Sequence, residues 1–108
     1  MNRACIALAA ILLLVASCTR HRARYEITGS ARQVSIVYLD STGAEATDAA
    51  VLLPWSYEFS CDSPRTLMVR ASWTVGTVAD VAIYVDDVLR QTGTTIDDRT
   101  IEARCTWP

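Results

Sequence analysis

Alternation of apolar and polar side chains constrains this chain more than any other feature. Over residues 55–61 every position of one parity is apolar, and serine or glutamate fills the positions between: Trp55, Tyr57, Phe59 and Cys61. Successive side chains of a strand point to opposite faces, so this pattern predicts a strand with one buried and one solvent-exposed face. The same period of two recurs at 67–73, 81–85 and 100–107.

Shorter runs rich in β-branched and aromatic residues predict further strands at 25–28, 33–40 and 88–92. Residues 45–53 form a weaker candidate, because their alanines would also suit a helix. About seven or eight short strands, separated by frequent turns, are typical of a small antiparallel β-sandwich of immunoglobulin-like type. We therefore expect an all-β fold, with a single domain over residues 25–108.

The first eighteen residues predict export and lipidation. A short basic start precedes an apolar run of 13 residues, 4–16, and the sequence Val15-Ala16-Ser17-Cys18 resembles the lipobox of bacterial lipoproteins. A bilayer span needs about 20 residues, so the run fits a cleaved signal peptide over 1–17. We expect acyl chains on Cys18 to hold the protein at the extracytoplasmic face of the cell membrane. An ordinary signal peptide without lipidation is the alternative, ahead of a buried N-terminal helix.

Charge divides the remaining chain into a basic tether, 18–24, and an acidic domain. Arg20, Arg22 and Arg24 would meet anionic headgroups beside a membrane, or would serve as a plain soluble spacer. From Tyr25 onward, 6 arginines face 12 acidic residues. This balance argues against nucleic acid as a partner, because phosphates would be repelled.

Cys61 and Cys105 fall on the apolar parity of their strands, so both are expected to face the core. An exported protein meets an oxidising environment, in which a disulfide between them is expected. Two buried free thiols are the alternative. A metal site fits less well, because two cysteines leave a tetrahedral shell incomplete and no histidine follows residue 24.

Catalytic chemistry finds no support in the pattern of side chains. The only histidine, His21, falls in the predicted tether, which leaves a Ser-His-Asp or Cys-His arrangement without its base. The adjacent pairs Asp86-Asp87 and Asp97-Asp98 fit solvated turns, with a weak calcium site as the alternative. We predict neither a catalytic residue, nor a metal site, nor a cofactor.

The aromatic residues supply the remaining candidates for contact with a partner. Those of 55–59 fit a sandwich interior. Three others would form a contact patch for a protein or an acyl ligand if they were exposed together: Tyr38, Tyr84 and Trp107.

Five segments, taken in order, resemble the extracytoplasmic domain of the MmpS family of small mycobacterial membrane proteins. They are Tyr25-Glu26-Ile27-Thr28-Gly29, Ser35-Ile36-Val37-Tyr38, Leu53-Pro54-Trp55-Ser56, Ile83-Tyr84-Val85-Asp86 and the late Cys105. The resemblance implies a β-sandwich on an N-terminal membrane anchor, acting as an accessory partner of MmpL transporters. These are RND-type exporters of lipids, siderophores and drugs.

The chain departs from the family pattern at three places. A lipidated cysteine replaces the usual transmembrane helix, Val81 stands where the family has a cysteine, and Asp87 replaces a glycine. Cys61 then looks like a relocated partner for Cys105. The leading hypothesis is a non-enzymatic accessory subunit of an MmpL-like transporter, and the sequence leaves its oligomeric state open. A lipoprotein that binds a lipid or small molecule in an apolar cavity is the alternative, and an enzyme is a more distant one.

Overall fold

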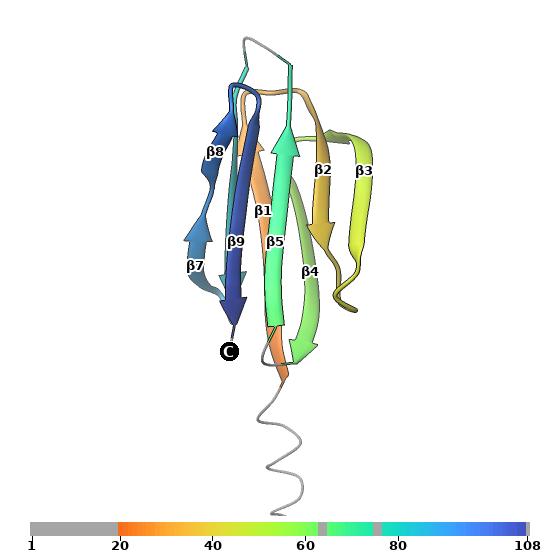
Figure 1. Ribbon diagram of the computed structural model, residues 1–108, viewed down its shortest axis with the longest axis vertical. Coiled ribbons are helices and arrows are strands. Elements are labelled where there is room, and N and C mark those ends of the chain that lie inside the picture. The colour runs from red at the N-terminus through yellow and green to blue at the C-terminus, as the bar shows by residue number, and fades with distance from the viewer. Residues whose placement is uncertain (1–19, 63–64, 75–76, 108) are drawn as a thin grey trace, which may run out of the picture.

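The computed structural model describes residues 20–62, 65–74 and 77–107, and these residues form nine strands in two sheets. The four-stranded sheet has the order β4 (Trp55–Asp62), β1 (Arg20–Gly29), β6 (Ala79–Val85) and β7 (Val88–Thr92). The five-stranded sheet has the order β3 (Glu45–Leu52), β2 (Gln33–Leu39), β5 (Arg65–Ser72), β9 (Thr100–Trp107) and β8 (Thr94–Asp97). Every neighbouring pair is antiparallel, and the two sheets pack face to face (Figure 1).

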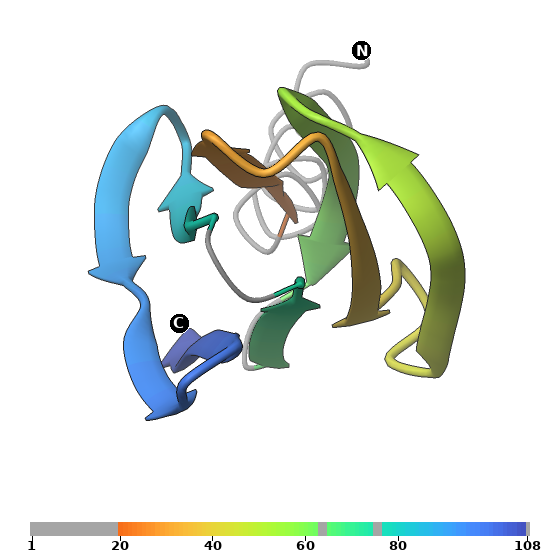
Figure 2. The same cartoon turned by 90° about the horizontal axis from the view of Figure 1, so that it is seen from above.

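The structure confirms the expected all-β sandwich and adds one strand to it. Residues 45–52 form a strand, and the described residues contain one strand that was not predicted, β8. Strands β7 and β8 are separated only by Gly93, where the chain passes from one sheet to the other on one flank (Figure 2). A side chain at position 93 would meet Ile101 and Val81 at 2.6–2.7 Å, so this crossing requires glycine.

Alternation places the core as predicted. The interior is filled by one parity of each central strand, and its largest fully buried side chains are these: Tyr25, Ile27, Val34, Ile36, Leu67, Val69, Ile83 and Val85. Phe59 is buried, while Trp55 and Tyr57 are half-buried and pack against the same cluster. The aromatic parity of β4 therefore points inward, as its sequence indicates.

The side chain of Tyr25 crosses from one sheet to the other and completes the second sheet. The ladder between β2 and β5 ends at the pair Tyr38 and Val69, so Leu39 and Met68 would form the next pair. Instead, the Tyr25 hydroxyl donates to the Leu39 carbonyl at 2.7 Å and accepts from the Met68 amide at 3.3 Å. A hydroxyl from β1 thus satisfies two backbone groups at the point where β2 leaves β5.

The described chain begins and ends at the same end of the sandwich. We call this end the N-terminal pole; it holds the start of β1, the end of β4, the turn between β6 and β7, and the end of β9 (Figure 1). That turn consists of Asp86 and Asp87, whose φ values of 53° and 65° match a two-residue type I′ hairpin. The expected tight turn is therefore present. The opposite pole holds the loop with Arg32 and the turn with Arg99.

Candidate functional site

Strand β1 begins at Arg20, five residues before the predicted start at Tyr25, so residues 20–24 of the expected tether belong to the sheet. Their pairing explains the difference, because β4 continues to Asp62 and offers Arg20 to Arg24 a full set of partners. The alternation of Arg20, Arg22 and Arg24 with His21 and Ala23 is itself a strand pattern. Residues 20–24 therefore carry a strand signal in the sequence in addition to their charge.

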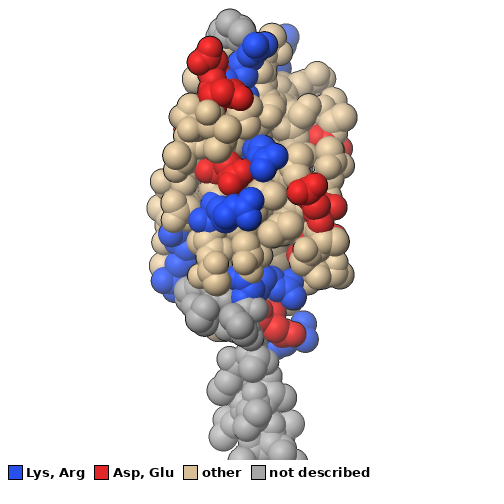
Figure 3. All heavy atoms as spheres, viewed as in Figure 1, with Lys and Arg blue, Asp and Glu red and all other residues tan. Residues whose placement is uncertain are grey.

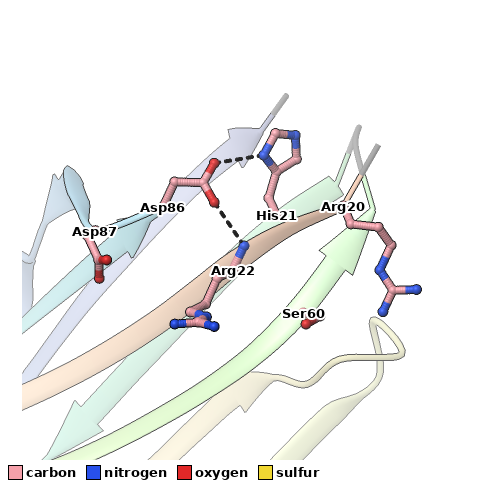
Figure 4. Close-up of a pocket in the computed structure, with 6 residues that line it drawn as sticks. All are labelled: Arg20, His21, Arg22, Ser60, Asp86 and Asp87. Atoms are coloured by element: carbon pink, nitrogen blue, oxygen red, sulfur yellow. Dashed lines mark hydrogen bonds and ion pairs between the residues drawn. The ribbon is translucent and has the colours of Figure 1, made fainter. Parts of the chain in front are cut away.

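Asp86 extends the pairing of β1 with β6 beyond its last ladder pair, Ala23 and Val85. The Asp86 amide donates to the Arg22 carbonyl at 2.8 Å, and the Arg22 amide donates to Asp86 Oδ1 at 3.1 Å (Figure 4). The second carboxylate oxygen lies 2.8 Å from His21 Nδ1. The Arg22 amide, followed by His21, holds the pKa of Asp86 below its usual range. We call residues 20–24 the root of β1. One carboxylate therefore fixes this root to the β6–β7 turn.

His21 thus lies in the folded domain, and our placement of it in a tether was wrong. Its position in the chain therefore does not exclude a catalytic arrangement. Whether one is formed depends on the groups around the imidazole. Ser60 lies opposite Arg22, on the other face of the sheet from His21, and in Figure 4 its hydroxyl is not directed at the imidazole. Cys61 is opposite His21, but burial raises the pKa of its thiol, which disfavours the nucleophilic thiolate.

The three arginines at the root of β1 differ in how firmly they are held. Arg24 donates to Glu26 and to Asp87 at 2.8 Å each, and its guanidinium lies 4.4 Å from the ring centroid of Tyr84. Its side chain is 24% exposed, against 65% for Arg20 and 66% for Arg22. Arg20 and Arg22 approach Asp62 and Glu58 only to 3.8 and 3.6 Å. Arg24 is therefore structural, while the other two remain open to solvent.

A surface hollow of about 400 Å³ opens beside this root. Its lining comes from β1, β4 and the β6–β7 turn, and Figure 4 shows all of its residues: Arg20, His21, Arg22, Ser60, Asp86 and Asp87. The hollow combines cationic and carboxylate groups with one hydroxyl. It can hold a small polar group, and it is not the apolar cavity that an acyl chain would need.

The predicted contact residues do not come together. Tyr38 faces the interior, half-buried, with its ring 4.8 Å from Tyr57 and 5.5 Å from Trp55 between centroids. Tyr84 lies on the outer face of the other sheet beneath Arg24. The side chain of Trp107 lies outside the described residues. A patch built from Tyr38 and Tyr84 is therefore not formed.

Cys61 and Cys105 both face inward, one from each sheet, as their parity predicts. Both are free cysteines in this structure, so the disulfide remains a prediction. The turn aspartates serve local structure: Asp97 accepts from the Arg99 amide at 2.8 Å, and Asp87 binds Arg24. Within the described ranges, no three metal-ligating side chains gather in one place.

The predicted signal peptide, 1–17, and the lipidation site, Cys18, lie outside the described residues. Across the residues that are described, no helix has the length and hydrophobicity to cross a membrane.

In the variant Asp86→Asn, the free energy of unfolding is expected to fall less steeply as the pH is lowered into the acid range. A carboxylate whose folded-state pKa is lowered contributes stability above its unfolded pKa, about 4, and loses it as pH falls through the folded-state pKa. Asp86 is half-exposed, so the contribution at neutral pH is below about 1 kcal/mol. Urea unfolding at pH values from 7 to 2 measures this, with Asp98→Asn as a control for the lost charge. An unchanged acid slope in Asp86→Asn would contradict the role of this carboxylate.

Comparison with known proteins places this arrangement in a family. The chain matches the sequence profile of a family described as Mycobacterium membrane protein over residues 5–105. A search of the curated proteins gave no match. The matched residues include the apolar N-terminal segment as well as almost the whole sandwich, including the root of β1. The chain therefore belongs to the Mycobacterium membrane protein family, the MmpS-type family of membrane-associated proteins.

Proposed function

We propose that the protein is a non-enzymatic accessory subunit of an MmpL-type exporter, that is, an RND-type transporter of lipids, siderophores or drugs. In this proposal it is a lipoprotein, held at the extracytoplasmic face of the cell membrane by acyl chains on Cys18. The observation that carries the proposal is the family match over residues 5–105, which joins the N-terminal segment and the β-sandwich in one unit.

The geometry of the sandwich supports a contact role near the membrane. Strand β1 begins at Arg20, two residues after Cys18, so an acylated Cys18 leaves almost no tether. A residue spans at most about 3.6 Å, so the start of β1 would lie within roughly 7 Å of the lipidated cysteine. The ten residues of β1 extend about 33 Å at strand spacing. We infer that the partner surface on the exporter lies within this distance of the membrane.

The interior supports a contact role over the alternative of a ligand cavity. Side chains from both sheets fill it, including Tyr25, which reaches across to the backbone of β2 and β5. A lipid-binding function would require the sheets to separate and this bridge to break.

Cross-linking of the native, lipidated protein in its own membranes, followed by mass spectrometry, tests the exporter partner. We expect an RND-type transporter as the dominant protein, with cross-links from the half of the sandwich nearest the N-terminal pole. Recovery of lipid alone, or of no reproducible protein, would contradict the accessory role and favour a lipid-binding lipoprotein.

Replacing Cys18 with serine tests the anchor separately. We expect most of the protein to move from the membrane to the soluble fraction, because the thiol that carries the acyl chain is lost. Cys5→Ser is the matched control, since it removes a cysteine from the predicted signal peptide and should leave the distribution unchanged. Membrane association of Cys18→Ser at the native level would rule out the lipoprotein anchor.

A further inference from the structure

We infer that the hollow at the N-terminal pole binds the phosphate of an anionic phospholipid in the bilayer that anchors the chain. The groups that would hold it are the guanidiniums of Arg20 and Arg22 and the hydroxyl of Ser60. The inference rests on the proposed membrane anchoring, and it adds a specific lipid contact to it.

Arg20 and Arg22 keep hydrogen-bond donors available for a ligand. Their closest contacts to Asp62 and Glu58, 3.8 and 3.6 Å, exceed the range of an N–H···O hydrogen bond, whereas Arg24 makes two at 2.8 Å. A guanidinium presents its N–H groups as a planar fork that matches two phosphate oxygens. The two exposed arginines are therefore suited to a phosphate, and Arg24 is not.

The two guanidiniums and the Ser60 hydroxyl line the hollow together, and in Figure 4 the guanidiniums lie on either side of Ser60. Ser60 pairs directly with Arg22 across β1 and β4, so its hydroxyl lies on the same face as the two guanidiniums. The carboxylates of Asp86 and Asp87 also line the hollow, and they come from the β6–β7 turn. Asp86 accepts from the Arg22 amide and contacts His21, and Asp87 accepts from Arg24, so both carboxylates already have partners within the pole.

The position of the hollow identifies a lipid as the source of the phosphate. Arg20 follows Cys18 by two residues, which places the hollow at headgroup level when Cys18 is acylated. Figure 3 shows several basic side chains at this lower end of the molecule, with acidic side chains among them. Basic groups this close to an anionic leaflet are attracted to it.

The test uses the full acylated chain in phosphatidylcholine nanodiscs with a rising fraction of phosphatidylglycerol. The backbone amide NMR signal of Ser60 reports occupancy of the hollow. We expect this signal to shift and saturate as the anionic fraction rises. In the double variant Arg20→Gln/Arg22→Gln, the apparent affinity should fall about 30-fold, since each arginine near the surface contributes about fivefold.

The matched control is Arg32→Gln/Arg99→Gln, which removes the same charge from exposed arginines at the opposite pole and should titrate like the wild type. An equal loss in this control would overturn the inference, because general charge attraction would then account for binding. A Ser60 signal that never shifts would also overturn it. So would the same shift produced by inorganic phosphate in discs without phosphatidylglycerol, which would indicate a site for the free ion.

Two checks separate failure of this inference from unfolding of the variants and from failure of the anchor or exporter proposals. The remaining amide signals of each variant must retain their wild-type positions, which shows that the sandwich is folded. Failure of the anchor is read independently from Cys18→Ser, and failure of the exporter role from cross-linking. Loss of the exporter role leaves the nanodisc titration interpretable on its own, whereas loss of the anchor removes the premise that places the hollow at headgroup level and overturns the inference.

Discussion

Replacing Tyr25 with phenylalanine is expected to lower the free energy of unfolding by about 1–3 kcal/mol. The change keeps the buried ring but removes the hydroxyl that joins the Leu39 carbonyl to the Met68 amide. These two backbone groups do not pair with each other directly, since the β2–β5 ladder ends one pair earlier. The Met68 amide would be left without this partner at a buried position and the Leu39 carbonyl at a part-buried one, and that desolvation is the main cost.

Urea denaturation of the two proteins at neutral pH measures the difference. The matched control is Tyr57→Phe, because the Tyr57 ring lies 6.3 Å from that of Tyr25 but no hydrogen bond of its hydroxyl occurs among the described residues. We expect this control to remain within about 0.5 kcal/mol of the wild type. If Tyr25→Phe were as stable as Tyr57→Phe, the hydroxyl bridge would not contribute to the fold. Burial raises the pKa of Tyr25, so the hydroxyl keeps its proton and its donor role through neutral pH.

We propose that Cys61 and Cys105 form a disulfide in the exported protein, and reduction is then expected to lower stability by about 4 kcal/mol. The bond would close a loop of 44 residues and would join the two sheets. Both thiols face the interior near the Tyr25 hydroxyl, whose pKa is raised first by burial and further by both cysteines. Burial also raises the pKa of both thiols, which suits a structural pair more than a reactive one.

Mass analysis without reductant should show the loss of one hydrogen from each thiol, and urea denaturation with and without reductant should show the stability difference. The variants Cys61→Ala and Cys105→Ala are matched controls, since neither should respond to reductant. Labelling of both thiols in unfolded, unreduced protein would show that the bond does not form in the exported chain.

The sequence predicts the sandwich well where the two faces of a strand meet different surroundings. In β4 one parity is aromatic and buried and the other is polar and wet, so alternation alone identifies the strand and its orientation. Strand β8, which follows the crossing at Gly93, is the opposite case. Residues 94–97 are exposed throughout, and β8 exists because the edge of β9 offers backbone partners. Side-chain pattern carries little signal for such a strand.

The N-terminal pole shows the same division. The sequence by itself determined the class of fold, the inward parity of Cys61 and the family resemblance, because these depend on local alternation and on the order of short segments. Only the tertiary structure decided that residues 20–24 belong to the sheet, since their partners lie in β4 and in the turn at Asp86, far away along the chain. The contrast between Arg24 and the two open arginines, Arg20 and Arg22, likewise arises from contacts between distant residues. Charge counted along the sequence cannot distinguish a guanidinium held by Asp87 and Tyr84 from one exposed to solvent.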